Sequence, residues 1–131
     1  MLANHNILLV DDEPAVLDVV KVWLTDHGCQ VRCAADGKEA MAAIETECPQ
    51  IMVVDWEMPN VNGIVLCNWV REHEEAKHVY ILFLTARSEV EAVVEALSTG
   101  ADDFLSKPVT KDRLLSRLHL AARRLGHAAA V

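Results

Sequence analysis

Residues 51–63, IMVVDWEMPNVNG, join an uninterrupted apolar run to a carboxylate, a loop and the start of a predicted helix. The run at 51–54 contains no polar residue, which is typical of a strand covered on both faces of a parallel sheet. Asp55 follows the run directly. After Gly63 the apolar residues recur at helical spacing, as Val65, Leu66, Trp69 and Val70. The stretch therefore predicts a strand–loop–helix unit with an acidic side chain at the end of its strand.

The same unit recurs along the chain. Short runs that read as strands lie at 7–10, 29–34, 51–54, 80–84 and 103–106, and helical apolar stripes lie between them. Parallel strands joined by helices need right-handed crossovers, and five units fit an open sheet better than a closed barrel. We therefore predict an α/β fold with a single doubly wound, flavodoxin-like parallel sheet of five strands in the order 2-1-3-4-5.

Start and stop signals support the predicted helices. Pro14 suits a first helical turn, and Gly28 and Gly100 suit helix ends, where a left-handed residue is common. Reciprocal N-terminal caps with a three-residue spacing are predicted for Asp36 with Glu39 and for Ser88 with Glu91, and Thr110 can cap the last helix.

The length of 131 residues fits one domain. We assign residues 1–126 to it and expect 127–131 to be a frayed tail or part of a linker. No apolar run approaches the roughly 18 residues of a membrane span, and the N-terminus lacks the pattern of a signal peptide. These features predict a cytoplasmic protein without membrane contact. The four cysteines, Cys29, Cys33, Cys48 and Cys67, are expected to be reduced, small buried hydrophobes rather than disulfides or zinc ligands, with Cys29 and Cys33 on one strand face.

The net charge of −8 argues against nucleic-acid binding by this domain. The charge is uneven, because residues 111–131 carry five basic side chains and one acidic side chain. Two interpretations stay open for this basic last helix. It is either a solvated helix whose terminal cations suit the helix dipole, or a surface that faces a partner.

Polar residues follow four of the predicted strands. They are Asp11 and Asp12, Asp55, Thr85, and Lys107. Carboxyl ends of parallel strands share one edge of a sheet, so we expect these side chains to meet there. Three close carboxylates repel one another by about 4 kcal/mol per pair at an effective dielectric near 20, so they must bind protons or a cation. An all-oxygen set favours a hard divalent ion, Mg²⁺ or Mn²⁺.

A carboxylate beside a divalent cation, a lysine and a hydroxyl donor is well suited to accept a phosphoryl group. The cations and donors stabilise the equatorial oxygens while Asp55 attacks in line. The product is an acyl phosphate, which is labile and suits a transient signal.

Four separated motifs resemble the receiver domain of bacterial two-component response regulators: VDDEP at 10–14, VVDWEMPNVNG at 53–63, LTA at 84–86 and GADDFLSKP at 100–108. The resemblance runs from about residue 5 to residue 125, and the motifs occur in the family's order. It implies that Asp55 is the phosphoacceptor, that Asp12 and Asp55 bind Mg²⁺, and that Asp11 acts through the ion's water shell. It implies the following further roles: the Glu57 backbone carbonyl as a metal ligand, Thr85 and Lys107 as phosphoryl contacts, Thr85 and Phe104 as switch residues, and a cis bond before Pro108.

The resemblance also implies partners. The phosphodonor would be a sensor histidine kinase, a histidine phosphotransfer protein or a small acyl phosphate. The face built by the fourth helix, fifth strand and fifth helix would dimerise or dock an effector once the domain is phosphorylated. Receivers with a similar ending precede output domains such as diguanylate cyclases, which is an analogy only.

Two loop residues are specific to this chain. Glu57 and Arg87 lie two positions beyond Asp55 and Thr85, and we hypothesise that they form an ion pair across the site and tune access of water to the phosphate. Two other functions remain as alternatives. One is a Mg²⁺-dependent phosphohydrolase in which Glu57 protonates a leaving group, and the other is a docking module that works without phosphorylation. We favour a switch that catalyses only its own phosphorylation and dephosphorylation, and is not an enzyme.

Overall fold

The computed structural model describes residues 2–58, 61–86 and 90–130. Five strands alternate with five helices in this part of the chain. The strands are β1 (Asn6–Val10), β2 (Gln30–Ala34), β3 (Ile51–Asp55), β4 (Tyr80–Thr85) and β5 (Asp103–Ser106). The helices are α1 (Pro14–Thr25), α2 (Gly37–Thr46), α3 (Gly63–Glu72), α4 (Val90–Ser98) and α5 (Lys111–Ala130).

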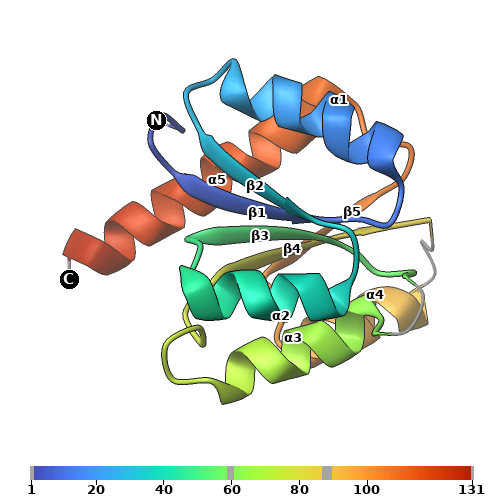
Figure 1. Cartoon of the computed structure of the whole chain (residues 1–131). Coiled ribbons are helices and arrows are strands. Elements are labelled where there is room, and N and C mark those ends of the chain that lie inside the picture. Colours follow the sequence, from blue (N-terminus) through green and yellow to red (C-terminus); the bar gives the residue numbers. More distant parts are fainter. Residues whose placement is uncertain (1, 59–60, 87–89, 131) are drawn as a thin grey trace.

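The strands form one parallel sheet in the order β2-β1-β3-β4-β5, which confirms the predicted fold class and strand order. Helices α1 and α5 cover one face of the sheet, and α2, α3 and α4 cover the other (Figure 1). The order reverses at β1, whose neighbours are β2 and β3. This arrangement opens a crevice at the carboxyl ends of β1 and β3.

The central strand β3 is buried along its whole length. Met52 and Val54 belong to the core beneath α2, α3 and α4, whereas Ile51 and Val53 belong to the core beneath α1 and α5. Successive strand residues point to opposite faces, so a strand covered on both sides needs an apolar residue at every position. This explains the uninterrupted apolar run at residues 51–54.

Several predicted helix signals are present as hydrogen bonds. Asp36 Oδ1 accepts from the backbone N–H of Glu39 at 2.8 Å, and Glu39 Oε1 accepts from the N–H of Ala35 at 3.1 Å. Thr110 Oγ1 accepts from the N–H of Arg113 at 3.3 Å at the start of α5. Gly28 and Gly100 adopt φ values of +83° and +106°, as the sequence predicted for these helix ends. The predicted cap at Ser88 lies outside the described residues.

Other local predictions were wrong. Val65 was predicted to face the core but is 49% exposed, whereas Cys67 is buried. The face of α3 that carries Cys67 packs against the core, and the side that carries Val65 faces solvent. Cys29 precedes β2 and is buried, whereas Cys33 and Cys48 are exposed, so the cysteines are not uniformly core residues. Helix α5 continues to Ala130, and a domain boundary at residue 126 stays a prediction. Among the described residues, no helix has both the length and the apolar character needed to cross a bilayer.

Gly63 begins α3 where the backbone passes close to β3 and β4. A Cβ atom at this position would lie 2.8 Å from Phe83 Cε1 and 3.0 Å from the Cα of Trp56. We predict that Gly63→Ala lowers the free energy of unfolding by about 1–3 kcal/mol through overpacking. Urea denaturation measures the effect. Gly126→Ala is the matched control, because nothing lies within 4 Å of its added Cβ, and equal midpoints for the two variants would contradict the prediction.

Candidate functional site

Three carboxylates meet at the carboxyl edge of the sheet. Asp55 is the last residue of β3, and Asp11 and Asp12 follow β1, its hydrogen-bonded neighbour. One carboxylate oxygen from each of the three lies within 4.8 Å of the others. The structure therefore brings together the acidic residues that the sequence placed at this edge.

Lys107 reaches the same place from the end of β5. Its Nζ lies 3.1 Å from Asp55 Oδ1, which also accepts a hydrogen bond of 3.2 Å from the backbone N–H of Glu57. The peptide bond between Lys107 and Pro108 is cis. The same oxygen of Asp55 is thus held by a cation and by a backbone donor.

Burial dominates the electrostatics of the acidic cluster. Asp11 and Asp55 are both 3% exposed. Burial raises the pKa of Asp55, and the hydrogen bond and charge of Lys107 offset only part of this effect. The pKa of Asp11 is also raised, chiefly by burial, although the Glu13 backbone N–H counteracts it. Burial alone would lower the pKa of Lys107, but its contacts with Asp55 outweigh this effect and raise it.

Asp11 has one satisfied and one unsatisfied oxygen. Oδ1 accepts from the backbone N–H of Glu13 at 2.9 Å, while Oδ2 is buried without a hydrogen-bond partner in the described part of the protein. A buried carboxylate oxygen without a partner is costly. An unsatisfied oxygen beside two further carboxylates, in a set without nitrogen or sulfur, fits a hard divalent cation and its bound water.

The side chain of Glu57 lies against Thr85. The Thr85 hydroxyl donates to Glu57 Oε1 at 3.1 Å, which joins the loop after β3 to the end of β4. The predicted partner of Glu57, Arg87, lies outside the described residues. Sequence reasoning missed the contact with Thr85, because the spacing of residues does not reveal which way an exposed loop side chain turns.

Two aromatic residues belong to the core beneath α2, α3 and α4. Trp56 is buried directly after Asp55, and its ring stacks on Phe83 with 5.8 Å between the ring centroids. The backbone N–H of Trp56 donates to the backbone carbonyl of Leu84, which holds the loop against β4. Phe104 is partly buried on β5 and packs against the core beneath α4. Its predicted role as a switch residue stays a prediction.

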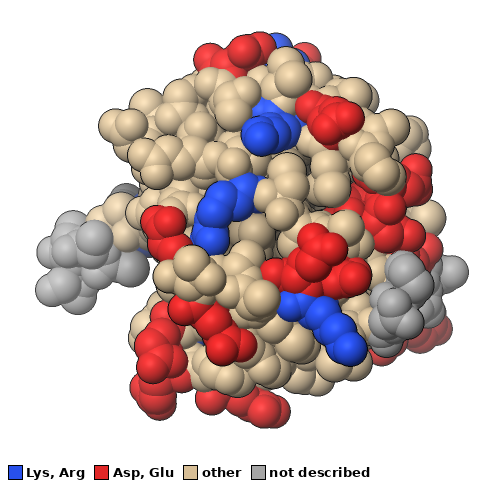
Figure 2. Space-filling view, viewed as in Figure 1, with Lys and Arg blue, Asp and Glu red and all other residues tan. Residues whose placement is uncertain are grey.

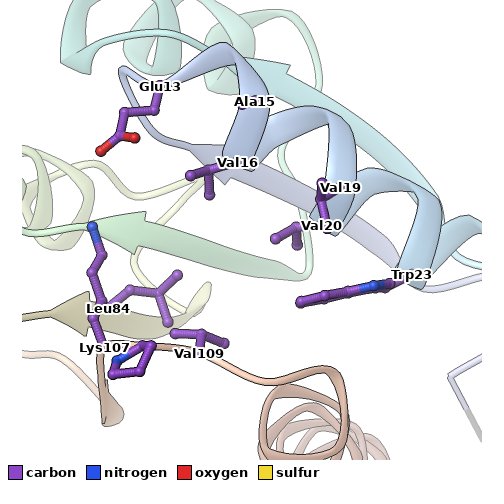
Figure 3. A pocket seen from close by; sticks show the side chains of 10 residues that line it. Glu13, Ala15, Val16, Val19, Val20, Trp23, Leu84, Lys107 and Val109 are labelled. Atoms are coloured by element: carbon purple, nitrogen blue, oxygen red, sulfur yellow. The ribbon is translucent and has the colours of Figure 1, made fainter.

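A groove of about 370 Å³ opens beside the cluster, between α1 and the segment that joins β5 to α5 (Figure 3). Its walls are mainly apolar, formed by Val16, Val19, Val20, Trp23, Leu84 and Val109. Glu13 and Lys107 lie at the same end of the groove, and Lys107 contacts Asp55. The sequence did not predict this groove, because its two walls are about ninety positions apart in the chain.

Comparisons with known proteins agree with this geometry. The family model described as "Response regulator receiver domain" matches residues 7–119. The transcriptional regulatory protein TrcR of Mycobacterium tuberculosis is 40% identical over 121 residues, which are 92% of this chain and 46% of TrcR. The phosphate regulon transcriptional regulatory protein PhoB of Rhizobium meliloti is 35% identical over 90% of this chain and 52% of its own length. The chain thus spans about half the length of these relatives.

Solved structures show the same architecture. The receiver domain of the Francisella response regulator 1452 superimposes with a TM-score of 0.87 at 31% identity, covering 93% of this chain and 99% of that domain. The BeF3-activated DrrB receiver domain gives a TM-score of 0.82 at 26% identity, covering 92% of this chain and 98% of its own.

Proposed function

Because the chain belongs to the response regulator receiver family, we propose that Asp55 is its phosphoacceptor and that phosphorylation requires Mg²⁺. The chain is a receiver domain of two-component signalling, with an acidic pocket of Asp11, Asp12 and Asp55 for a phosphoaspartate. Such a domain is a signalling module rather than a turnover enzyme. The observation that supports the choice of Asp55 is its position, 3.1 Å from Lys107 and within the acidic cluster.

Each neighbour of Asp55 has a proposed task. Asp12, Asp55 and the backbone carbonyl of Glu57 would hold Mg²⁺ (or Mn²⁺), and Asp11 would orient water bound to the ion. The ion, when bound, supplies positive charge that offsets the repulsion between the carboxylates and the incoming phosphoryl oxygens. Lys107 holds Asp55 in place and is free to shift its ammonium to a phosphoryl oxygen after Asp55 has attacked phosphorus. The bond between phosphorus and the donor breaks as the bond to Asp55 forms, and the donor leaves on the side of phosphorus opposite Asp55.

Thr85 would contact the phosphoryl group through its hydroxyl. In the unphosphorylated protein that hydroxyl donates to Glu57, so the proton must be redirected when a phosphoryl oxygen arrives. Glu57 therefore competes with the phosphoryl group for this donor. Movement of Thr85 toward the phosphate would vacate space for Phe104 to change rotamer, which is the proposed switch.

Glu57 is proposed to control how long the phosphate survives. We predict that Glu57→Ala changes the dephosphorylation rate by up to about tenfold, toward faster loss, because water gains access to the phosphoryl group when the side chain is removed. The decay of acetyl-phosphate-labelled protein after gel filtration measures the rate. Glu72→Ala removes an exposed glutamate of α3 and serves as the control. An unchanged rate in Glu57→Ala would rule out the access role proposed for Glu57 and Arg87.

Receiver domains partner with histidine kinases. We propose that a kinase or a histidine phosphotransfer protein donates the phosphoryl group here, with a helix of the donor lying in the groove between α1 and the β5–α5 segment (Figure 3). The groove supports this role because its apolar walls end at Lys107 and Glu13, where a phosphohistidine would approach Asp55. The relatives named as transcriptional regulators make a DNA-binding regulator the proposed setting of the domain, although nucleic-acid binding is not proposed for the domain itself.

The α4-β5-α5 face is the proposed output surface. Arg117 of α5 pairs with Asp103 of β5 at 3.5 Å, and Asp102 pairs with Arg71 of α3 at 2.8 Å. We predict a dimer through this face only in the phosphorylated state. Sedimentation velocity with Mg²⁺ and beryllofluoride should show a dimer, and a monomer under both conditions would contradict the prediction.

A further inference from the structure

A second cleft lies far from the acidic cluster, between the C-terminal ends of α2 and α3. It has a volume of about 410 Å³ and is lined by Ile44, Glu45, Trp69, His73, Glu75 and Ala76. In a parallel α/β sheet the helices end at the edge opposite the carboxyl ends of the strands, as α2 and α3 do relative to β3 (Figure 1). The cleft therefore lies at the end of the molecule opposite Asp55, the last residue of β3. Its volume is within the range of ligand pockets.

Two stacked rings form one wall of the cleft. The indole of Trp69 and the imidazole of His73 have centroids 3.9 Å apart and planes tilted by 32°. The Nδ1–H of His73 donates to the backbone carbonyl of Trp69 at 2.7 Å, which fixes the imidazole at the end of α3. Trp69 also packs against the core beneath α2, α3 and α4. The rings are therefore held in place before any ligand arrives.

The rim of the cleft is acidic. Within the described residues, the carboxylates of Glu45 and Glu75 have no hydrogen bond or ion pair, and no lysine or arginine lines the cleft. Exposed acidic side chains gather over the ends of α2 and α3, at the lower left of Figure 2. The potential at this surface attracts cations, as does the net charge of −8.

We propose that this cleft binds an arginine side chain from a basic segment of a partner protein. A guanidinium group is planar and weakly hydrated, so it stacks on an indole more readily than an ammonium group does. Its five N–H donors can serve two carboxylates at once, and the cleft offers Glu45 from α2 and Glu75 from the turn after α3. Arginine therefore fits a cleft with an aromatic wall and two unpaired carboxylates better than lysine does.

The probe is a peptide with blocked termini, acetyl-Gly-Arg-Arg-Arg-Gly-amide. It is titrated into the protein while the indole N–H signals of the three tryptophans are followed by NMR. The Trp69 signal is assigned with Trp69→Phe. We expect the Trp69 signal to shift saturably while the Trp23 and Trp56 signals stay in place. The lysine analogue of the peptide should bind several-fold more weakly. No saturable shift of Trp69, or equal binding of the two peptides, would overturn the proposal.

Charge-matched variants separate the cleft from general attraction to an acidic surface. The double variant Glu45→Gln/Glu75→Gln should weaken binding by about three- to tenfold. Trp69→Leu should weaken it by about threefold, read from the backbone amide signals of Glu45 and Glu75 because the Trp69 indole is absent. Glu39→Gln/Glu72→Gln removes the same charge at exposed positions outside the cleft and should leave the affinity unchanged. Equal losses in both double variants would overturn the proposal.

Two further controls define the occupant. The Trp69 signal is also recorded at several protein concentrations without peptide. A shift that grows with protein concentration, together with self-association, would overturn the proposal of a separate partner and indicate that a second copy of this chain fills the cleft. Asp55→Asn should bind the arginine peptide as tightly as the wild type, because the cleft does not depend on the phosphoacceptor. The proposal of arginine binding and the proposal that Asp55 is the phosphoacceptor can therefore fail independently.

Discussion

Asp55→Asn is expected to take up no phosphoryl group from acetyl phosphate, under conditions in which the wild-type protein gains one. The asparagine amide cannot attack phosphorus as a carboxylate does, so the covalent step is removed rather than slowed. Intact-mass measurement after incubation with acetyl phosphate and Mg²⁺ reads the result directly. The same incubation with EDTA should leave the wild type unmodified, because the acidic cluster then repels the donor without a cation to offset it.

The substitution is chosen to preserve the surroundings of residue 55. Asparagine has nearly the shape of aspartate, and its amide oxygen can still accept the backbone N–H of Glu57. Circular dichroism and the fluorescence of Trp56 check that the fold is intact. Phosphorylation that persists in Asp55→Asn would place the phosphoacceptor elsewhere. A wild type that binds Mg²⁺ but takes no phosphoryl group would favour the phosphorylation-independent docking module.

Asp11→Asn is expected to weaken Mg²⁺ binding by about 10- to 100-fold, the usual cost of losing a residue that orients a metal's surroundings. Quenching of Trp56 fluorescence or isothermal titration measures the affinity. The exposed Asp18 of α1 offers a matched control, because Asp18→Asn removes the same charge away from the cluster and should leave the affinity unchanged. Equal Mg²⁺ affinity in Asp11→Asn and the wild type would exclude Asp11 from the metal site.

The same variant is expected to be more stable than the wild type in EDTA at neutral pH. Burial raises the pKa of Asp11, so the folded protein holds the proton more tightly than the unfolded chain does. The stabilising effect of this proton is present at low pH and is lost as the pH rises through the raised pKa. Above that pKa the wild type carries a buried charge that asparagine lacks. Thermal unfolding at several pH values should show the advantage of Asp11→Asn shrinking as the pH falls.

Mg²⁺ should reverse this order. A ligand that binds only the folded state stabilises it in proportion to its affinity, so saturating Mg²⁺ should raise the unfolding temperature of the wild type more than that of Asp11→Asn. A stability difference that does not depend on Mg²⁺ would mean that Asp11 acts only through packing and hydrogen bonding.

The sequence by itself determined the fold class, the strand order and the edge at which the acidic residues meet. The apolar runs report burial on both faces, and parallel strands place their carboxyl ends together, so Asp11, Asp12 and Asp55 had to converge. Helix ends at Gly28 and Gly100 followed from the left-handed conformation that favours glycine. These features depend on the periodicity of apolar residues and on the backbone preferences of single residues. Both are set by residues that are neighbours in the sequence.

Only the tertiary structure decided which side chains pair and where the surface is hollowed. Glu57 meets Thr85, and Asp102 meets Arg71, although each pair is separated by about thirty positions in the chain. Val65 faces solvent and Cys67 the core, because the rotation of α3 depends on how the helix packs against the sheet. The cleft at Trp69 likewise needs two helices to end side by side. Such contacts depend on the reach and direction of side chains from distant segments, which local periodicity does not encode.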